Sequence, residues 1–176
     1  MAQQDKSLSL LLEALSLKNL PRTGWTLRGA PRESVAEHVY GAATIALVLS
    51  RMEKLAAKDE HTLLRIALLH DLHEARIGDL VPSQKEKLKP DEAKVEREML
   101  SGTALSGEIA LLSGKKASKR ILMLARDADR LDMLFRALEN KSKGNVRMQE
   151  FIDSALLQIK SRSGKKLAGL ALREKK

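Results

Sequence analysis

Apolar residues recur along most of this chain at intervals of three and four, the spacing that places them on one face of an α-helix. The clearest stretches run from about Ser7 to Asn19, from Ser34 to Ala57, from Ser118 to Asn140 and from Val146 to Ile159. No stretch shows the strict alternation of a half-buried strand, and no internal repeat is present. The pattern therefore predicts an all-α fold, a single-domain helical bundle.

Side chains with capping chemistry indicate where several helices begin. Ser34 is followed three residues later by Glu37, which is the pattern of a capping box. Asp59 is placed to cap the helix that follows it, and Asp91 is placed to cap a polar helix. The segment 21–31 contains proline and glycine and is predicted to be a loop.

Two parts of the chain carry weaker patterns. Three glycines leave the local structure of residues 101–117 open. The last predicted helix is followed by sequence rich in lysine and arginine. We therefore expect the helical bundle to span residues 1–160, and residues 161–176 to form a basic C-terminal tail of uncertain order.

The core of such a bundle must be aliphatic, because hydrophobic residues make up 43% of the chain and aromatic residues only 2%. The absence of cysteine excludes disulfides, cysteine-ligated zinc and thiol catalysis, and it fits a reducing interior. The leucine-rich start is interrupted by Glu13 and predicts an amphipathic helix, not a signal peptide. No apolar run reaches membrane-spanning length, so we expect a soluble, cytoplasmic protein with no membrane partner.

The chain carries 32 lysine and arginine residues against 23 acidic residues, a formal net charge of +9. Such a charge attracts nucleic acid, acidic lipid or phosphorylated metabolites. The basic residues form clusters spread along the chain, with almost no aromatic side chain between them to stack on bases. Nucleic acid is therefore not the expected partner, and phosphorylated small molecules remain compatible with the charge.

The most informative pair in the sequence is His70-Asp71, which closes an apolar helical run and is followed by Glu74. An imidazole and a neighbouring carboxylate can bind one divalent cation together. On a continuing helix Glu74 shares one sector with both residues, and His38 lies on the apolar face of a separate helix upstream. Burying two imidazoles and several carboxylates without a cation is unfavourable, so the sequence predicts a metal site.

A histidine on an apolar face also has a simpler interpretation as a hydrogen-bonded core residue. The ordered set is what favours a metal site over that interpretation. His61, near a helix start, and His73, beside the pair, are expected not to bind the metal. On the downstream helix Asp129 and Asp132 both lie at the edge of the apolar stripe, whereas Asp127 is expected to face solvent. Spacing alone does not separate Asp129 from Asp132.

Four stretches, in order, make the chain resemble the HD-domain superfamily of metal-dependent phosphohydrolases: Ser34–His38, Leu69–Glu74, Gly78-Asp79 and Arg126–Leu131. The segment Pro21–Trp25 and the spacing from Glu74 to Asp79 are similar to its 5′-deoxynucleotidase branch, which releases phosphate from deoxyribonucleoside 5′-monophosphates. The resemblance covers residues 15–138. It implies an HD-type helical bundle that acts as a homodimer on a deoxynucleoside monophosphate.

The resemblance implies that a divalent cation, cobalt, manganese or magnesium, is held by four side chains: His38, His70, Asp71 and Asp129. It implies catalytic roles for Glu74 and Asp79, which can alternatively help to hold a second cation. Glu74 is placed to take a proton from the attacking water or to orient that water. Asp79 is suited to protonating the leaving 5′-oxygen or to orienting the sugar.

Substrate-binding residues are expected in the loop before the helix of His38, where the resemblance places Arg22 and Trp25 beside the nucleotide. An arginine can hold phosphate oxygens bidentately, and Arg22, Arg76 and Arg32 are the candidates. Arg32 is equally well explained as a surface residue. Trp25 is suited to stacking on the base or deoxyribose, and equally to filling the core.

Two other functions compete with a 5′-deoxynucleotidase. An HD phosphohydrolase with the same site can act on a cyclic nucleotide, a nucleoside triphosphate or a guanosine alarmone, and the short chain argues against the last of these. A basic helical module that binds nucleic acid and keeps a vestigial site is the third interpretation. The complete set of metal-binding side chains argues against it.

Overall fold

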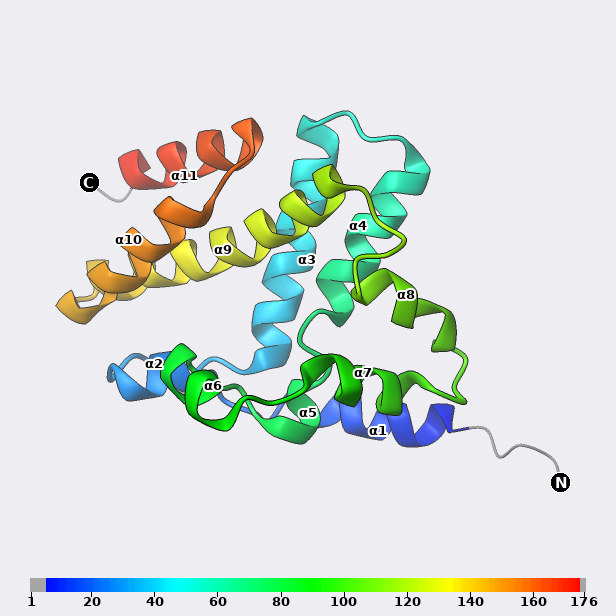
Figure 1. Ribbon diagram of the computed structural model, residues 1–176. Helices are drawn as coiled ribbons and strands as arrows, with labels where there is room; N and C mark the ends of the chain where they lie inside the picture. The colour runs from blue at the N-terminus through cyan, green and yellow to red at the C-terminus, as the bar shows by residue number, and fades with distance from the viewer. Residues whose placement is uncertain (1–5, 175–176) are drawn as a thin grey trace, which may run out of the picture.

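Three helices form the centre of the computed structural model, which describes residues 6–174. α3 (Val35–Met52), α4 (Ala57–Leu69) and α9 (Lys119–Ser142) pack against one another, and α9 crosses the other two in Figure 1. α10 (Gln149–Gln158) and α11 (Arg162–Glu174) pack on α9. The crossing brings together the helices that carry the histidines and carboxylates singled out in the sequence.

Shorter elements surround these helices. They are α1 (Ser7–Ser16), α2 (Thr23–Leu27), α5 (Glu74–Ile77), α6 (Pro82–Leu88), α7 (Glu92–Leu100), α8 (Ile109–Leu112) and two 3-10 turns, Ser106–Glu108 and Val146–Met148. Residues 6–174 contain no strand, and an isolated bridge joins Pro21 to Ser34. The predicted all-α, single-domain fold is confirmed.

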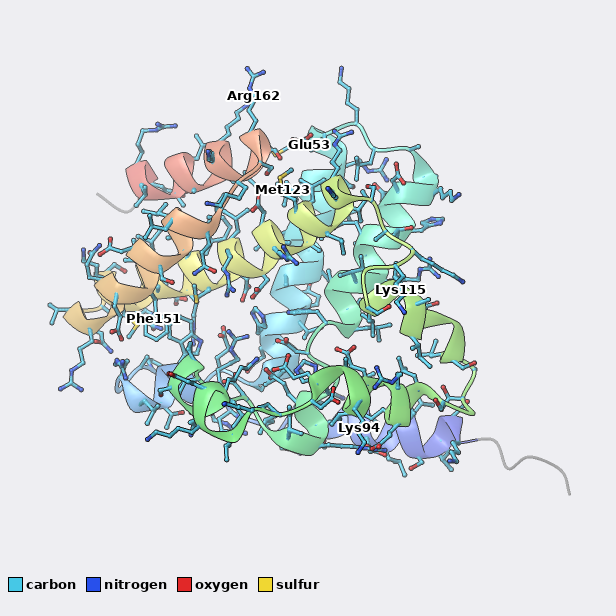
Figure 2. All side chains as sticks on the ribbon, viewed as in Figure 1. Glu53, Lys94, Lys115, Met123, Phe151 and Arg162 are labelled. Atoms are coloured by element: carbon cyan, nitrogen blue, oxygen red, sulfur yellow. The ribbon has the colours of Figure 1, made fainter. Side chains whose placement is uncertain are left out.

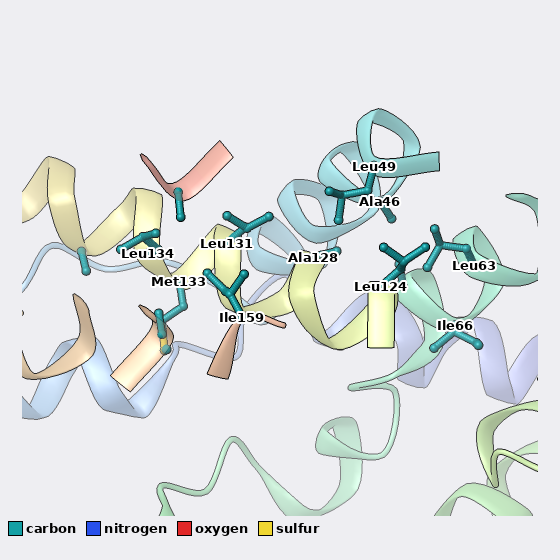
Figure 3. Close-up of a cluster of buried hydrophobic side chains, with 14 of the residues drawn as sticks. Ala46, Leu49, Leu63, Ile66, Leu124, Ala128, Leu131, Met133, Leu134 and Ile159 are labelled. Atoms are coloured by element: carbon teal, nitrogen blue, oxygen red, sulfur yellow. The ribbon is translucent and has the colours of Figure 1, made fainter. Parts of the chain in front are cut away.

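The core is aliphatic, as the composition predicts. Figure 3 shows Leu49 of α3, Leu63 of α4 and Leu124 of α9 converging where the three central helices meet. All three side chains are fully buried. Burial of a leucine contributes about 1.5–3 kcal/mol, so this aliphatic junction fixes how the three helices sit relative to one another.

Helix starts follow the capping chemistry in most places. The hydroxyl of Ser34 accepts from the backbone N–H of Glu37 at 3.2 Å, and the Glu37 carboxylate accepts from the backbone N–H of Ser34 at 2.6 Å. The predicted capping box of α3 is therefore present, and Asp91 caps α7. The prediction for Asp59 is wrong: Ala56 occupies the N-cap position of α4, and Asp59 lies in the first turn, where the helix dipole favours a carboxylate.

Two segments are more helical than the apolar pattern predicts. The predicted loop 21–31 contains α2, in which Trp25 is buried. Beyond residue 160, where no helix is predicted, α11 packs on α9 and buries Ala168. Residues 1–5 of the predicted bundle and residues 175–176 of the predicted tail lie outside the described residues. The boundary expected at residue 160 stays a prediction.

Asp127 does not face solvent, in contrast to the expectation. Its side chain accepts hydrogen bonds from the backbone N–H groups of Lys160 at 2.9 Å and Ser161 at 2.7 Å, and the residue is 1% exposed. A Cβ on Gly164 would lie 2.8 Å from its Oδ2 atom. Asp127 therefore accepts the hydrogen bonds of two backbone N–H groups at the junction of α10 and α11, and its role is structural.

Charged side chains extend over the surface in all directions. In Figure 2 Arg162 and Lys94 lie at opposite ends of the molecule, so the positive charge is not gathered in one stripe. Among the described helices, none has both the length and the apolarity needed to cross a bilayer.

Candidate metal centre

Two histidine rings lie edge to face beside the carboxylate of Asp71. His38, on the buried face of α3, is completely buried, and its ring centroid lies 5.5 Å from that of His70, directly after α4. The Nδ1 atom of His38 lies 2.6 Å from Oδ2 of Asp132, and Nδ1 of His70 lies 2.9 Å from the carbonyl oxygen of Ala67. Both acceptors require a proton on Nδ1, so the neutral form of each ring has its lone pair on Nε2.

The two Nε2 atoms are buried and make no hydrogen bond. Instead they point toward carboxylates. Oδ2 of Asp71 lies 3.5 Å from Nε2 of His38 and 3.3 Å from Nε2 of His70, and Oδ1 of Asp129 lies 3.3 Å from Nε2 of His38. Ligand atoms of His38, His70 and Asp71 all fall within 4.8 Å of one another. Two imidazole nitrogens and carboxylate oxygens that converge without protein partners fit a divalent cation.

The chain turns sharply after His70, contrary to the continuing helix considered from the sequence. α4 ends at Leu69, residues 70–73 form a turn, and α5 begins at Glu74. The turn still brings the Glu74 carboxyl to the cleft beside Asp71. Gly78 then adopts a φ of 80°, a conformation that favours glycine, and the chain reverses so that Asp79 also reaches the cleft.

The electrostatics of the cluster favour a positive charge. Burial lowers the pKa of His70, but the nearby carboxylates of Asp71 and Asp129 outweigh it and raise the pKa to about 9. Burial raises the pKa of Asp71, but the charges of His70 and His38 outweigh it and lower the pKa. Burial and the charges of Asp71 and Asp79 raise the pKa of Glu74 to about 9. Without a cation, protons must compensate this group of carboxylates.

A cleft of about 580 Å³ opens over the carboxylates, a volume typical of small-molecule sites. Four acidic residues line it: Asp71, Glu74, Asp79 and Asp129. Three basic residues, Arg22, Lys85 and Arg130, also line it, together with uncharged residues that include Trp25, Met133, Phe151, Ser154 and Gln158. Basic side chains close to a candidate metal site are suited to a substrate that carries phosphate.

Arg22 lies at the centre of this arrangement. Its guanidinium is 3.7 Å from Oδ2 of Asp71 and 3.9 Å from Oδ2 of Asp79. Thr23 fixes Asp79 from two sides, because its backbone N–H donates to the carboxylate at 2.5 Å and its hydroxyl donates to the carbonyl at 2.6 Å. The start of α2 is thereby held against the segment that follows α5.

Trp25 is a core residue that also borders the cleft. It is 2% exposed, and its ring lies 4.6 Å from that of Phe151 between centroids, so most of the indole fills the core. The indole N–H donates to Glu33 at 2.5 Å. Trp25 nevertheless lines the cleft, together with Phe151, which points from α10 toward α2 in Figure 2.

The structure does not bring Arg76 to the other site residues. Its guanidinium pairs with Glu13 of α1 at 2.5 Å and borders a separate groove between α1 and α7. Helix α5 is one turn long, and this pairing directs residue 76 away from the cleft. Arg32 donates to the carbonyl oxygen of Asn19 and also lies elsewhere. The predicted role of Arg76 therefore has no support in this arrangement.

Several residues near the candidate site give little signal in the sequence. Lys85 belongs to a stretch rich in lysine and glutamate that resembles a solvated surface, and Arg130 gives no signal apart from its position next to Asp129. The sequence leaves Asp129 and Asp132 as alternatives for the downstream carboxylate. In the structure Asp132 contacts Nδ1 of His38, whereas Asp129 approaches Nε2. His73 is buried near Glu92 and Glu96, and it does not belong to the group of potential metal ligands that contains His38 and His70.

Comparisons with known proteins found similar sequences and structures for most of this chain. A model of the HD-domain family matches residues 14–170. The 5′-deoxynucleotidase HDDC2 of Bos taurus is 32% identical over 152 residues, which cover 78% of this chain and 70% of the bovine protein. A conserved hypothetical protein from Pyrococcus furiosus is 33% identical, with a TM-score of 0.76, and the match covers 95% of this chain and 99% of that chain.

A more distant structure has the same fold. The HD phosphohydrolase DatZ of cyanophage S-2L, solved with dA and one catalytic Zn²⁺ ion, is 18% identical to this chain. Its TM-score is 0.65, and the match covers 93% of this chain and 95% of that chain. At this identity the likeness extends to the fold alone.

Proposed function

This chain belongs to the HD-domain family, and from that premise we propose that it is a metal-dependent 5′-deoxynucleotidase, which hydrolyses deoxyribonucleoside 5′-monophosphates to deoxynucleoside and phosphate. The similar bovine protein carries this activity in its name. The observation that carries the proposal is the pair of unpartnered Nε2 atoms, His38 and His70, that meet Asp71 and Asp129 below a cleft lined with basic groups.

In this proposal His38, His70, Asp71 and Asp129 hold one divalent cation. Cobalt, manganese and magnesium are the proposed metals, and zinc is included in the test because the cyanophage phosphohydrolase holds it. When bound, the cation supplies positive charge that stabilises a phosphoryl group and lowers the pKa of a water molecule. The Nδ1–H bonds to Asp132 and Ala67 keep both histidine rings in the orientation that this role requires.

Glu74 and Asp79 are the proposed catalytic residues. Burial and the charge of Asp71 raise the pKa of Glu74. A cation bound to Asp71 would offset that charge and favour the ionised form of Glu74, which accepts a proton from the attacking water. Asp79, fixed by Thr23, protonates the leaving 5′-oxygen or orients the sugar. Arg22, between Asp71 and Asp79, presents guanidinium N–H groups to the phosphate. Lys85 and Arg130 add positive charge to the cleft.

The proposal includes a homodimer in the cytoplasm. Four leucines on α1 are at least half exposed and form an apolar surface suited to burial against a second copy: Leu8, Leu11, Leu12 and Leu15. The absence of cysteine fits a reducing compartment. Nucleic acid is not a proposed partner, because the positive charge is dispersed over the surface.

The experiment restores single cations to metal-stripped protein and measures products from a panel of nucleotides. The panel contains deoxy- and ribonucleoside 5′-monophosphates, a cyclic nucleotide and a nucleoside triphosphate. We expect phosphate release from the deoxynucleoside monophosphates only when a divalent cation is present. If only the cyclic nucleotide or only the triphosphate is hydrolysed, the proposed substrate is wrong and the proposed metal site still stands. Equal phosphate release without any cation would contradict the proposal.

A further inference from the structure

His38 has a carboxylate partner on the side of its ring that faces away from the cation site. Oδ2 of Asp132 lies 2.6 Å from Nδ1 of His38, and the side chain of Asp132 is 15% exposed. His38 and Asp132 belong to α3 and α9, the long helices at the centre of the bundle. Within residues 6–174 the Asp132 carboxylate makes no hydrogen bond to another group. The hydrogen bond to His38 is therefore the interaction that the position of Asp132 provides.

The space for this carboxylate exists because residue 41 is glycine. A Cβ on Gly41 would lie 1.9 Å from Oδ1 and 2.9 Å from Cγ of Asp132, far inside van der Waals contact. Gly41 lies one turn after His38, so the two residues face α9 together. Glycine within a helix is less stable than alanine, and the close approach of Asp132 accounts for its presence here.

The two histidines are oriented by different acceptors. His70 donates to the backbone carbonyl of Ala67, three residues earlier in the last turn of α4, so its partner is local and uncharged. His38 donates to a charged side chain from another helix. A carboxylate behind a metal-binding imidazole fixes its tautomer and raises its basicity more than a neutral acceptor does.

We propose that Asp132 is a positioning residue of the metal centre: it accepts the Nδ1 proton of His38 and so presents Nε2 to the cation, while Gly41 makes room for it. The inference rests on the proposed function only in taking His38 as a metal ligand. Asp129 approaches the opposite nitrogen of the same ring, so the two carboxylates, three residues apart, have different tasks.

The test measures the affinity of metal-stripped protein for Co²⁺ by the absorbance of the bound ion, without substrate. Asp132→Ala is expected to weaken binding about 10- to 100-fold, the usual effect of removing a partner behind a metal-binding histidine. Asp132→Asn keeps the side-chain shape without the charge and is expected to fall between Asp132→Ala and the wild type. Asp127→Ala removes another buried carboxylate of α9, and it should leave the Co²⁺ affinity unchanged because Asp127 contacts only the α10–α11 junction.

Gly41→Ala tests the same contact from the other side. It is expected to weaken Co²⁺ binding in the wild-type protein, because Asp132 must leave His38 to make room. In the Asp132→Ala background it is expected to have no further effect, since the obstructed atoms are gone. Equal losses from Gly41→Ala in both backgrounds, or wild-type affinity in Asp132→Ala and Asp132→Asn, would overturn the proposal.

His70→Ala separates this inference from the proposed function. It should weaken Co²⁺ binding whatever Asp132 does, because His70 is a proposed ligand with its own acceptor. If His70→Ala binds Co²⁺ as the wild type does, the metal site itself is wrong. If His70→Ala fails to bind and Asp132→Ala binds normally, only the role of Asp132 is wrong.

Discussion

Asp129 and Asp132 approach opposite nitrogens of a single ring, that of His38. Oδ1 of Asp129 lies 3.3 Å from Nε2, and Oδ2 of Asp132 lies 2.6 Å from Nδ1. In the proposed site, Asp129 lies next to the free lone pair and shares the cation, and Asp132 orients the imidazole. Asp129→Ala should therefore reduce metal affinity and turnover more than Asp132→Ala does. Calorimetric titration with Mn²⁺ checks the order, and the reverse order would exchange the two assignments.

Glu74 is expected to act in the reaction without being needed to hold the cation. Glu74→Gln should retain metal and nucleotide binding, because four other side chains are proposed to hold the ion. Its turnover number should fall by roughly 10²–10⁴-fold, the usual contribution of a positioned acid–base group. Steady-state kinetics with a measurement of bound metal tests this. Near-normal turnover would remove Glu74 from the mechanism, and loss of the ion would make it a ligand.

Arg22 and Arg76 form a matched pair of arginines for testing substrate binding. Arg22 lines the cleft between Asp71 and Asp79, whereas Arg76 pairs with Glu13 outside it. Arg22→Ala should raise KM for every accepted mononucleotide by roughly 10- to 100-fold, because the phosphate is common to all of them. Arg76→Ala should leave KM unchanged. A similar KM in both variants would mean that Arg22 does not bind the phosphate.

Asp127 is expected to contribute to stability and not to catalysis. Asp127→Ala leaves the backbone N–H groups of Lys160 and Ser161, the second of them buried, without their acceptor, and the free energy of unfolding should fall by about 2–4 kcal/mol. Exposed Asp153 provides the control, and Asp153→Ala should change stability by at most about 0.5 kcal/mol. Urea unfolding measures both. An unchanged midpoint for Asp127→Ala would contradict the role given to this carboxylate.

The metal-free protein should lose stability as the pH rises from about 6.5 to 9. The folded state raises the pKa of His70 from 6.5 to about 9 and that of Glu74 from 4.5 to about 9. In this range the folded chain binds more protons than the unfolded chain, so the stabilisation present at low pH disappears through pH 9. Urea midpoints at the two pH values, with EDTA present, measure the loss. A higher midpoint at pH 9 would contradict these shifts.

The helices and the histidine pair could be predicted because they depend on local patterns. His38 and His70 lie on regular apolar stripes, and a buried helix face places such residues in the core whatever its neighbours are. The choice between Asp129 and Asp132 depends instead on the exact rotation of α9 against α3. Contacts such as the one between Gly41 of α3 and Asp132 of α9 fix that rotation, and the sequence of α9 alone does not reveal them.

The positions of Asp127 and Arg76 in the structure share a non-local cause that the sequence does not reveal. Asp127 is buried because its partners, the backbone N–H groups of Lys160 and Ser161, lie more than thirty residues further along the chain. Arg76 is turned away from the cleft because Glu13, more than sixty residues earlier, pairs with it. Neither partner can be recognised from residues near Asp127 or Arg76.

Phosphate release from a deoxynucleoside 5′-monophosphate, followed as one divalent cation is added back to metal-stripped protein, tests the central claim most directly. The wild type should gain activity in proportion to the metal that it binds. The variant carrying both His70→Ala and Asp71→Ala should bind the ion weakly and stay inactive, because two of the four proposed ligands are gone. Full metal occupancy and wild-type phosphate release in that double variant would contradict the account.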